Sequence, residues 1–223
     1  MAKDREIETI ISENLDKPAF ELGQEYGEIA LDSFVDNDVL REIPIVKTVV
    51  GIGKGLVAVK NIYFAKKLLA FLEKFHTGNL PEDKLDDFKF KLNDDETYRQ
   101  KVVEHVVVYN ERFVSIKKSE VLANLFLAHL NGKFDWQGFE ELSEIVDSVQ
   151  IRAFEVLKNS ADSDDPFHFV TADHQADGGG VLFSAGLCII HGNHYSVNAY
   201  GRYLYYYGIL GDINFEFPQQ NQP

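Results

Sequence analysis

The sequence predicts a mainly α-helical protein, in which a multi-helix bundle precedes a small winged-helix-like α+β unit at the C-terminus. Apolar residues recur at three- and four-residue spacing over most of residues 1–158, which is typical of amphipathic helices. Prolines and capping residues divide that stretch into segments of helical length. The composition then becomes polar and acidic at residues 159–166, and glycines and short apolar runs follow. We therefore expect a helical bundle domain over 1–158 and a winged-helix-like domain with a tail over 159–223.

Length and composition narrow the class of protein further. The chain has 223 residues, of which 45% are hydrophobic and 26% charged, so it can bury a sizeable core. Its formal net charge of −14 disfavours non-specific binding to nucleic acid. The single Cys188 excludes an internal disulfide framework and fits a reducing compartment. The N-terminus carries acids where a signal peptide would have basic residues, and we expect a cytoplasmic protein.

The expected helices follow one another along the bundle domain. They cover residues 4–14, 18–35, 44–75, a segment that starts at Pro81, and residues 96–114, 119–131, 134–149 and 151–157. Pro18, Pro44 and Pro81 each suit a first helical turn. Asn93-Asp94-Asp95-Glu96 offers a capping residue followed by acids, and Gly132 suits the position just past a helix end.

The C-terminal domain begins with a loop-like stretch over 172–180 and reads as a hairpin followed by a short helix. Two apolar runs, 187–190 and 195–197, flank Gly192-Asn193, which suits a two-residue turn. Asn198 can cap a helix over 199–208. A helix, a two-stranded wing and a short helix are typical of the end of a winged-helix-like unit. DNA readout would need basic residues, but Arg202 is the only lysine or arginine in 165–217.

Residues 43–75 are an apolar run with six lysines and one acidic residue. The lysines are Lys47, Lys54, Lys60, Lys66, Lys67 and Lys74. In a straight helix, Lys47 and Lys54 would lie roughly opposite Lys60 and Lys67, so each half is amphipathic on a different side. This favours a bent core helix whose lysine stems reach water. Contact of these lysines with a membrane or another anionic partner is the alternative. A simple bilayer span is disfavoured, because Lys54 and Lys60 would cost about 5–7 kcal/mol near its centre.

A cluster of tyrosines near the C-terminus is a further candidate site. Tyr195, Tyr200, Tyr203, Tyr206 and Tyr207 form a dense tyrosine cluster. They could supply a partner-contact surface, since tyrosines give large contact area at low entropic cost, or fill the small domain's core.

The histidines raise the possibility of a metal site. The candidates His168, His174, His191 and His194 accompany several aspartates. Their spacing matches no known ligand pattern, and an acidic linker with histidines at a hairpin tip explains them as well. Residues 51–55 (GIGKG) lack the remainder of a phosphate loop. Since no other catalytic motif is recognisable in the sequence, we expect no cofactor and no catalytic residues.

Part of the bundle resembles a known family. Leu122-Ala123-Asn124-Leu125, the apolar residues Phe139, Leu142 and Ile145, and residues 153–157 resemble the helical core of abortive-infection alpha-type proteins. Residues 39–61 are also similar to the start of an uncharacterised bacterial family with an I-P-I/V apolar helix. Those families combine a helical part with a winged-helix-like end. The resemblance implies a bacterial cytosolic protein in phage defence, and it transfers no catalytic residues.

Three functions follow as expectations. The first is a non-enzymatic bacterial defence or stress protein that acts through protein or membrane contacts. On activation, its 43–75 helix would become membrane-active and the protein would lie at the membrane surface. The second is a winged-helix-like adaptor or regulator that binds a protein partner or itself, with DNA less favoured. The third is a metal-dependent hydrolase built on the 164–194 loop.

Overall fold

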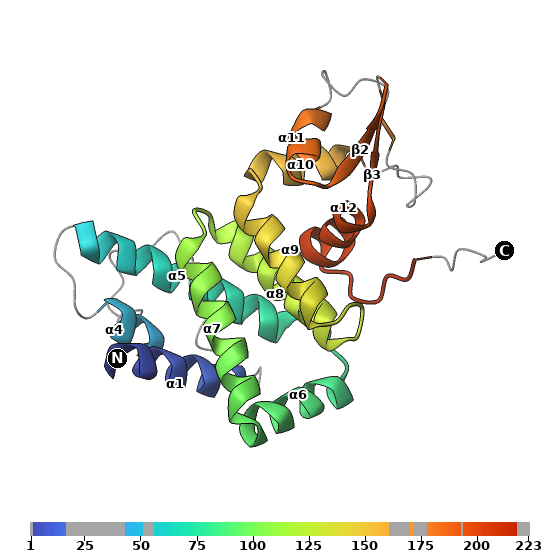
Figure 1. The fold of residues 1–223 in the computed structure, drawn as a ribbon. Helices are drawn as coiled ribbons and strands as arrows, with labels where there is room; N and C mark the ends of the chain where they lie inside the picture. The colour runs from blue at the N-terminus through green and yellow to red at the C-terminus, as the bar shows by residue number, and fades with distance from the viewer. Residues whose placement is uncertain are drawn as a thin grey trace. The chain divides into compact units, whose positions relative to one another are not determined.

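The computed structural model describes residues 2–16, 43–50, 56–160, 170–171, 178–192 and 194–217. The chain forms two compact units, residues 1–123 and 124–223. The predicted boundary after residue 158 lies near the end of α10, inside the second unit. The predicted class is confirmed, since the described chain is mainly helical and has a small antiparallel sheet towards its C-terminus (Figure 1).

The first unit is built from helices. They are α1 (Ala2–Asp16), α4 (Pro44–Val50), α5 (Leu56–Thr77), α6 (Glu82–Asp94), α7 (Glu96–Arg112) and the first half of α8 (Ile116–Leu130). Helix α7 packs against α1, α5 and α6, and α1 also contacts α4 and α6. The predicted start of α7 is confirmed, because the Asp95 side chain accepts a hydrogen bond from the Tyr98 backbone N–H at 3.0 Å. The helix predicted over 18–35 lies outside the described residues.

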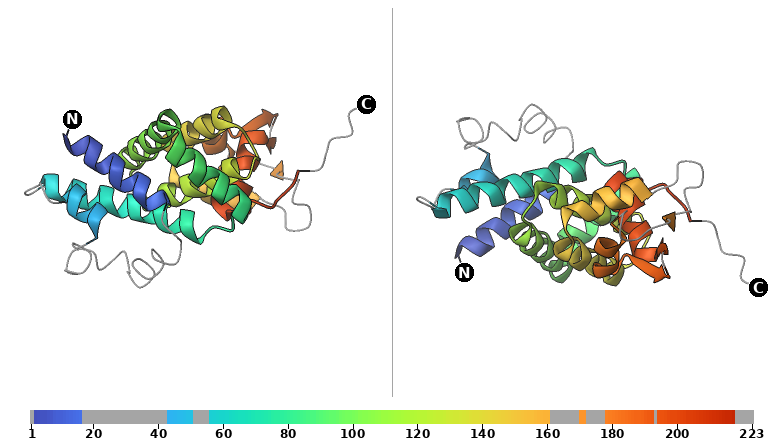
Figure 2. Two further views of the ribbon diagram at one scale, coloured as in Figure 1. Left: turned by 90° about the horizontal axis from the view of Figure 1, so that it is seen from below. Right: turned by 90° about the horizontal axis from the view of Figure 1, so that it is seen from above.

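The central apolar run is two helices and not one rod. Helix α4 ends at Val50, α5 begins at Leu56, and the two helices contact each other. Figure 2 shows α4 folded back against the first turns of α5. The expectation was one bent helix over 43–75, whereas the described residues form two helices on either side of residues 51–55, which are not described. The expectation of a core element was right for the second half of α5, where Leu68, Leu72 and Phe75 are buried. Among the described helices, none combines the length and apolar character needed to cross a bilayer.

The second unit continues from α8 into α9 (Trp136–Ser148) and α10 (Ile151–Ser160). It then contains β1 (Val170–Thr171), α11 (Gly179–Ser184), β2 (Cys188–His191), β3 (His194–Val197), α12 (Ala199–Tyr203) and the π-helix η2 (Leu204–Leu210). The strands form an antiparallel sheet in the order β1-β3-β2. A strand after α10 and a hairpin after α11 make this unit winged-helix-like (Figure 1).

The hairpin and the helix after it form where the sequence predicts them. His191 pairs with His194 in register across the turn, and Gly192 has a positive φ of 62°. The Asn198 side chain accepts a hydrogen bond from the Gly201 N–H at 3.0 Å and caps α12. Two details differ from the expectation. Strand β1 adds a third strand beside β3, and α11 begins inside the glycine stretch predicted as loop.

Candidate functional site

The structure distributes the lysines of the central run over very different environments. Lys47 and Lys60 are exposed, Lys66 and Lys74 are half-buried, Lys67 is buried, and Lys54 lies outside the described residues. The first turns of α5 also expose Val59 and Tyr63. Exposure therefore allows a membrane or anion contact at Lys60, but such a contact cannot use Lys67 without opening the unit.

Lys67 has a structural role. Its side chain is only 3% exposed, and its Nζ donates hydrogen bonds to the backbone carbonyls of Phe113 at 2.5 Å and Glu111 at 3.0 Å. These carbonyls lie at the C-terminal end of α7, where no further turn of helix supplies donors. Burial lowers the pKa of Lys67 below its ordinary value, and the charge of Glu111 partly opposes that change. Lys67 therefore caps a helix in this structure, and its predicted contact with a membrane or an anion stays a prediction.

The tyrosine cluster is mostly interior. Tyr195, Tyr206 and Tyr207 are buried, Tyr203 is half-buried and Tyr200 is exposed. The Tyr206 ring stacks on Phe215 with centroids 3.6 Å apart, and the Tyr207 hydroxyl donates to the Phe215 carbonyl at 3.0 Å. Of the two predicted roles, filling the core of the small unit applies to the three buried rings. Tyr200 alone has the exposure of a contact residue, and its hydroxyl donates to the Glu141 carboxylate.

The candidate metal-binding histidines do not form a defined site in the described part of the chain. His191 and His194 are paired in register between β2 and β3, whereas His168 and His174 lie outside the described residues. Within the described ranges, no group of three or more His, Cys, Asp or Glu side chains could hold a metal ion. Burial raises the pKa of the Cys188 thiol to about 11, so this thiol is protonated at neutral pH and a poor nucleophile.

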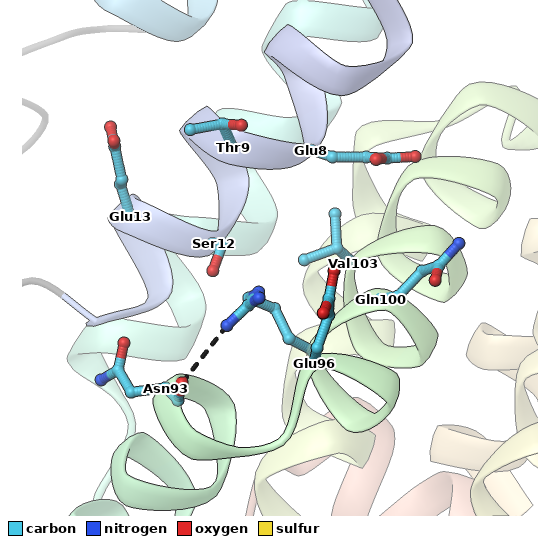
Figure 3. Close-up of a pocket in the computed structure, with 9 residues that line it drawn as sticks. Glu8, Thr9, Ser12, Glu13, Asn93, Glu96, Gln100 and Val103 are labelled. Atoms are coloured by element: carbon cyan, nitrogen blue, oxygen red, sulfur yellow. Dashed lines mark hydrogen bonds between the residues drawn. The ribbon is translucent and has the colours of Figure 1, made fainter. Parts of the chain in front are cut away.

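A concave surface of the first unit lies between α1 and α7. It consists of two adjoining cavities of about 570 and 380 Å³, which share Glu8 and Gln100. We call their combined lining the α1–α7 groove. Its residues are Ile7, Glu8, Thr9, Ser12 and Glu13 of α1, Val49 of α4, Asn61 and Phe64 of α5, Asn93 of α6, and Glu96, Arg99, Gln100, Val103, Glu104, Val107, Val108 and Glu111 of α7. Figure 3 shows the larger cavity, where Glu8 and Ser12 of α1 face Val103 and Gln100 of α7.

The floor of the groove is apolar in the smaller cavity, which is lined by Ile7, Val49, Phe64, Val107 and Val108. The larger cavity is lined by polar side chains apart from Val103, and the edges of both cavities are acidic. Ile7, Val49 and Val103 are buried, while Val108 is 39% exposed at the rim. Five glutamates line the groove against one arginine. That arginine, Arg99, donates to the carbonyls of Leu92 at 3.2 Å and Asn93 at 3.3 Å, the second of which is dashed in Figure 3. Its guanidinium is thus engaged by the end of α6, and the groove presents mainly negative charge.

The residues of the groove escaped the sequence analysis, although α7 carries a signal for them. The α7 residues that line it recur at three- and four-residue spacing from Glu96 to Glu111, so they occupy one face of the helix. That face mixes valines with glutamates and resembles an ordinary solvent-exposed edge in the sequence. The packing of α1 beside α7 turns it into the wall of a groove.

Comparisons with known proteins found no match to any family model, any curated protein or any solved structure.

Proposed function

We propose that this chain is a non-enzymatic adaptor that acts by binding another protein through the α1–α7 groove. The observation that carries the proposal is the groove itself, which combines buried valines and an isoleucine with five glutamates along its edges. Protein–protein contact surfaces often combine an apolar centre with a polar rim. The negative charge of the glutamates at the edges favours a partner that carries positive charge.

The second unit supports protein contact over DNA contact. In a winged-helix-like unit, the helix before the hairpin is the element suited to a DNA groove, and here that helix is α11. It carries no lysine or arginine, and it exposes Phe183, whose side chain is 55% accessible. Ile189 on β2 is exposed as well. An apolar surface without basic residues suits a protein partner and offers nothing to phosphates.

Site-specific photo-crosslinking in the cell that makes the protein tests the adaptor function. A benzophenone amino acid replaces Val108 at the rim of the groove, and the matched control places it at Phe90, which is exposed on α6 outside the groove. We expect a discrete crosslinked product from position 108 and none from position 90. Equal labelling from both positions, or none from position 108, would show that the groove is not the contact site.

The biological setting is a separate proposal. The resemblance of residues 119–157 to abortive-infection alpha-type proteins supports a role in bacterial phage defence, exerted through the same protein contacts. Phage plating on cells carrying the wild-type gene or Val108→Arg tests this role. We expect protection that the groove variant loses. If the variant protects as well as the wild type, the groove does not serve defence.

A membrane contact is a weaker candidate, favoured by exposed Val59, Lys60 and Tyr63 at the start of α5. Leakage of anionic vesicles would detect it, and Lys54→Glu combined with Lys60→Glu should abolish the leakage. Leakage that persists in this double variant would show that these lysines are not responsible.

A further inference from the structure

We infer that the α1–α7 groove accepts one amphipathic α-helix that carries lysine or arginine on both sides of an apolar stripe. This inference rests on the proposed adaptor function and specifies the chemistry of the partner. Three properties of the groove lead to it: its length, its apolar floor and the placement of its charges.

The length of the groove matches a helix of about four turns. The α7 residues that line it run from Glu96 to Glu111, and a rise of about 1.5 Å per residue makes this face roughly 22 Å long. Helix α1 provides the opposite wall through residues 7–13. Two helical walls beside the apolar floor of the smaller cavity are a setting in which a third helix packs, with its own apolar residues at three- and four-residue spacing over that cavity.

The charges of the groove select a basic helix. Glu8 lies at the junction of the two cavities, Glu104 and Glu111 line the end nearer α5, and Glu13 and Glu96 line the other. Lysine or arginine side chains flanking an apolar stripe would meet these carboxylates, while the stripe covers Val107 and Phe64. A neutral helix would bury the floor but leave the carboxylates without counter-charges.

The same charges exclude two other occupants. Nucleic acid would be repelled by the glutamates. Residues 17–42 of the chain itself carry seven acidic residues against two basic ones, so they have the wrong charge to fill the groove. The fitting partner is therefore a basic amphipathic segment of another protein.

Peptide binding to the full-length protein tests the inference. The probe is a fluorescently labelled, amidated peptide of about 18 residues with leucines at three- and four-residue spacing and lysines on both flanks. Two companion peptides keep the leucine pattern but replace every lysine with glutamine or with glutamate. Each peptide is titrated by fluorescence anisotropy against the wild type, against Glu8→Lys/Glu104→Lys, and against Asp86→Lys/Asp87→Lys. The last variant makes the same change in net charge at exposed positions of α6 outside the groove.

We expect the lysine peptide to bind the wild type more tightly than the glutamine and glutamate peptides. The groove variant should weaken its binding at least about tenfold, while the α6 variant changes it by less than about twofold. Circular dichroism of both variants checks that they keep the helical content of the wild type.

Four results would overturn the inference. Equal weakening by both variants would mean diffuse attraction to an acidic protein. Equally tight binding of the glutamine peptide would mean that charge does not select the helix, although the adaptor function would stand. A sedimenting dimer that Glu8→Lys/Glu104→Lys dissociates would make a second copy the occupant. If none of the peptides binds, a basic helix is not the ligand, and crosslinking at position 108 decides the adaptor function separately.

Discussion

The Lys67 ammonium on α5 lies 2.5 Å from the carbonyl oxygen of Phe113, just beyond the last residue of α7. A helix C-terminus carries unpaired carbonyls and a partial negative charge, and a cation there is favourable. One buried side chain therefore links two helices that are 46 residues apart at this contact. It also helps to hold α7, the longer wall of the groove, against α5.

Replacement of Lys67 by methionine should destabilise the first unit. The change keeps most of the buried stem but leaves the carbonyls of Glu111 and Phe113 without their donor, which costs about 1–3 kcal/mol of unfolding free energy. Lys60→Met, at an exposed position of the same helix, should change it by less than about 0.5 kcal/mol. Urea unfolding followed by circular dichroism measures both. Equal effects of the two substitutions would refute the capping role.

His76 should make the first unit sensitive to acid. Its Nε2–H donates to the Asn14 carbonyl at 2.8 Å, and burial lowers the pKa of His76 from 6.5 to about 4. Between these values the unfolded chain binds a proton that the folded chain does not, so stability falls as the pH drops from about 6.5 to 4. The full loss is on the order of 3 kcal/mol.

Comparison with His76→Gln isolates this effect from the titration of carboxylates. Glutamine can keep a donor for the Asn14 carbonyl but does not titrate. The difference in unfolding free energy between wild type and variant should shrink or change sign as the pH falls from 7 to 4. A difference that is constant over that range would contradict the role of His76.

Tyr195 should contribute to stability through its hydroxyl, and Tyr200 should not. The Tyr195 side chain is fully buried, and its hydroxyl lies 2.7 Å from Ser160 Oγ, which in turn donates to the Val156 carbonyl at 2.6 Å. Tyr195→Phe should cost about 1 kcal/mol in urea unfolding, because it removes a buried hydrogen bond. Tyr200→Phe, at an exposed position, is the matched control, and an equal or larger loss there would contradict this assignment.

Gly201 should tolerate no side chain. A Cβ atom there would lie 2.4 Å from both the Leu187 carbonyl oxygen and Val197 Cγ1, so the backbone of the β2 segment would have to move. Gly201→Ala should lower the unfolding free energy of the second unit by about 1–3 kcal/mol. Gly180→Ala is the control, because its Cβ would enter open space in α11, and helix propensity predicts a gain of up to about 1 kcal/mol. Thermal unfolding of both variants gives the comparison, and similar melting temperatures would count against the close packing at Gly201.

Features that depend on neighbours in the chain were predictable from the sequence. Asp95 caps α7, Asn198 caps α12, and Gly192 lies in the β2–β3 turn. Each depends on a side chain or a backbone conformation within three residues, which local sequence encodes directly. The two-residue strand β1 was missed, because it is recognisable only through its pairing with β3.

The environments of the candidate site residues, in contrast, were not predictable from the sequence. Lys60 and Lys67 lie seven residues apart on the same stripe of α5, yet Lys60 is exposed and Lys67 caps α7. The difference arises because Lys67 lies beside the C-terminal end of α7. Tyr195 and Tyr200 belong to one cluster in the sequence, yet they lie in the core and on the surface respectively.

The amino-acid order alone thus determined the helical class, the capped start of α7, the β2–β3 hairpin and the excess of negative charge, all of which follow from periodicity, capping, turn residues and composition. Tertiary packing decided which lysines are buried and where the glutamates gather. Glu8 and Glu104 are 96 positions apart and line one cavity only because α1 lies against α7. Burial and charge proximity depend on which faces meet in three dimensions, and periodicity within one helix does not specify its neighbour.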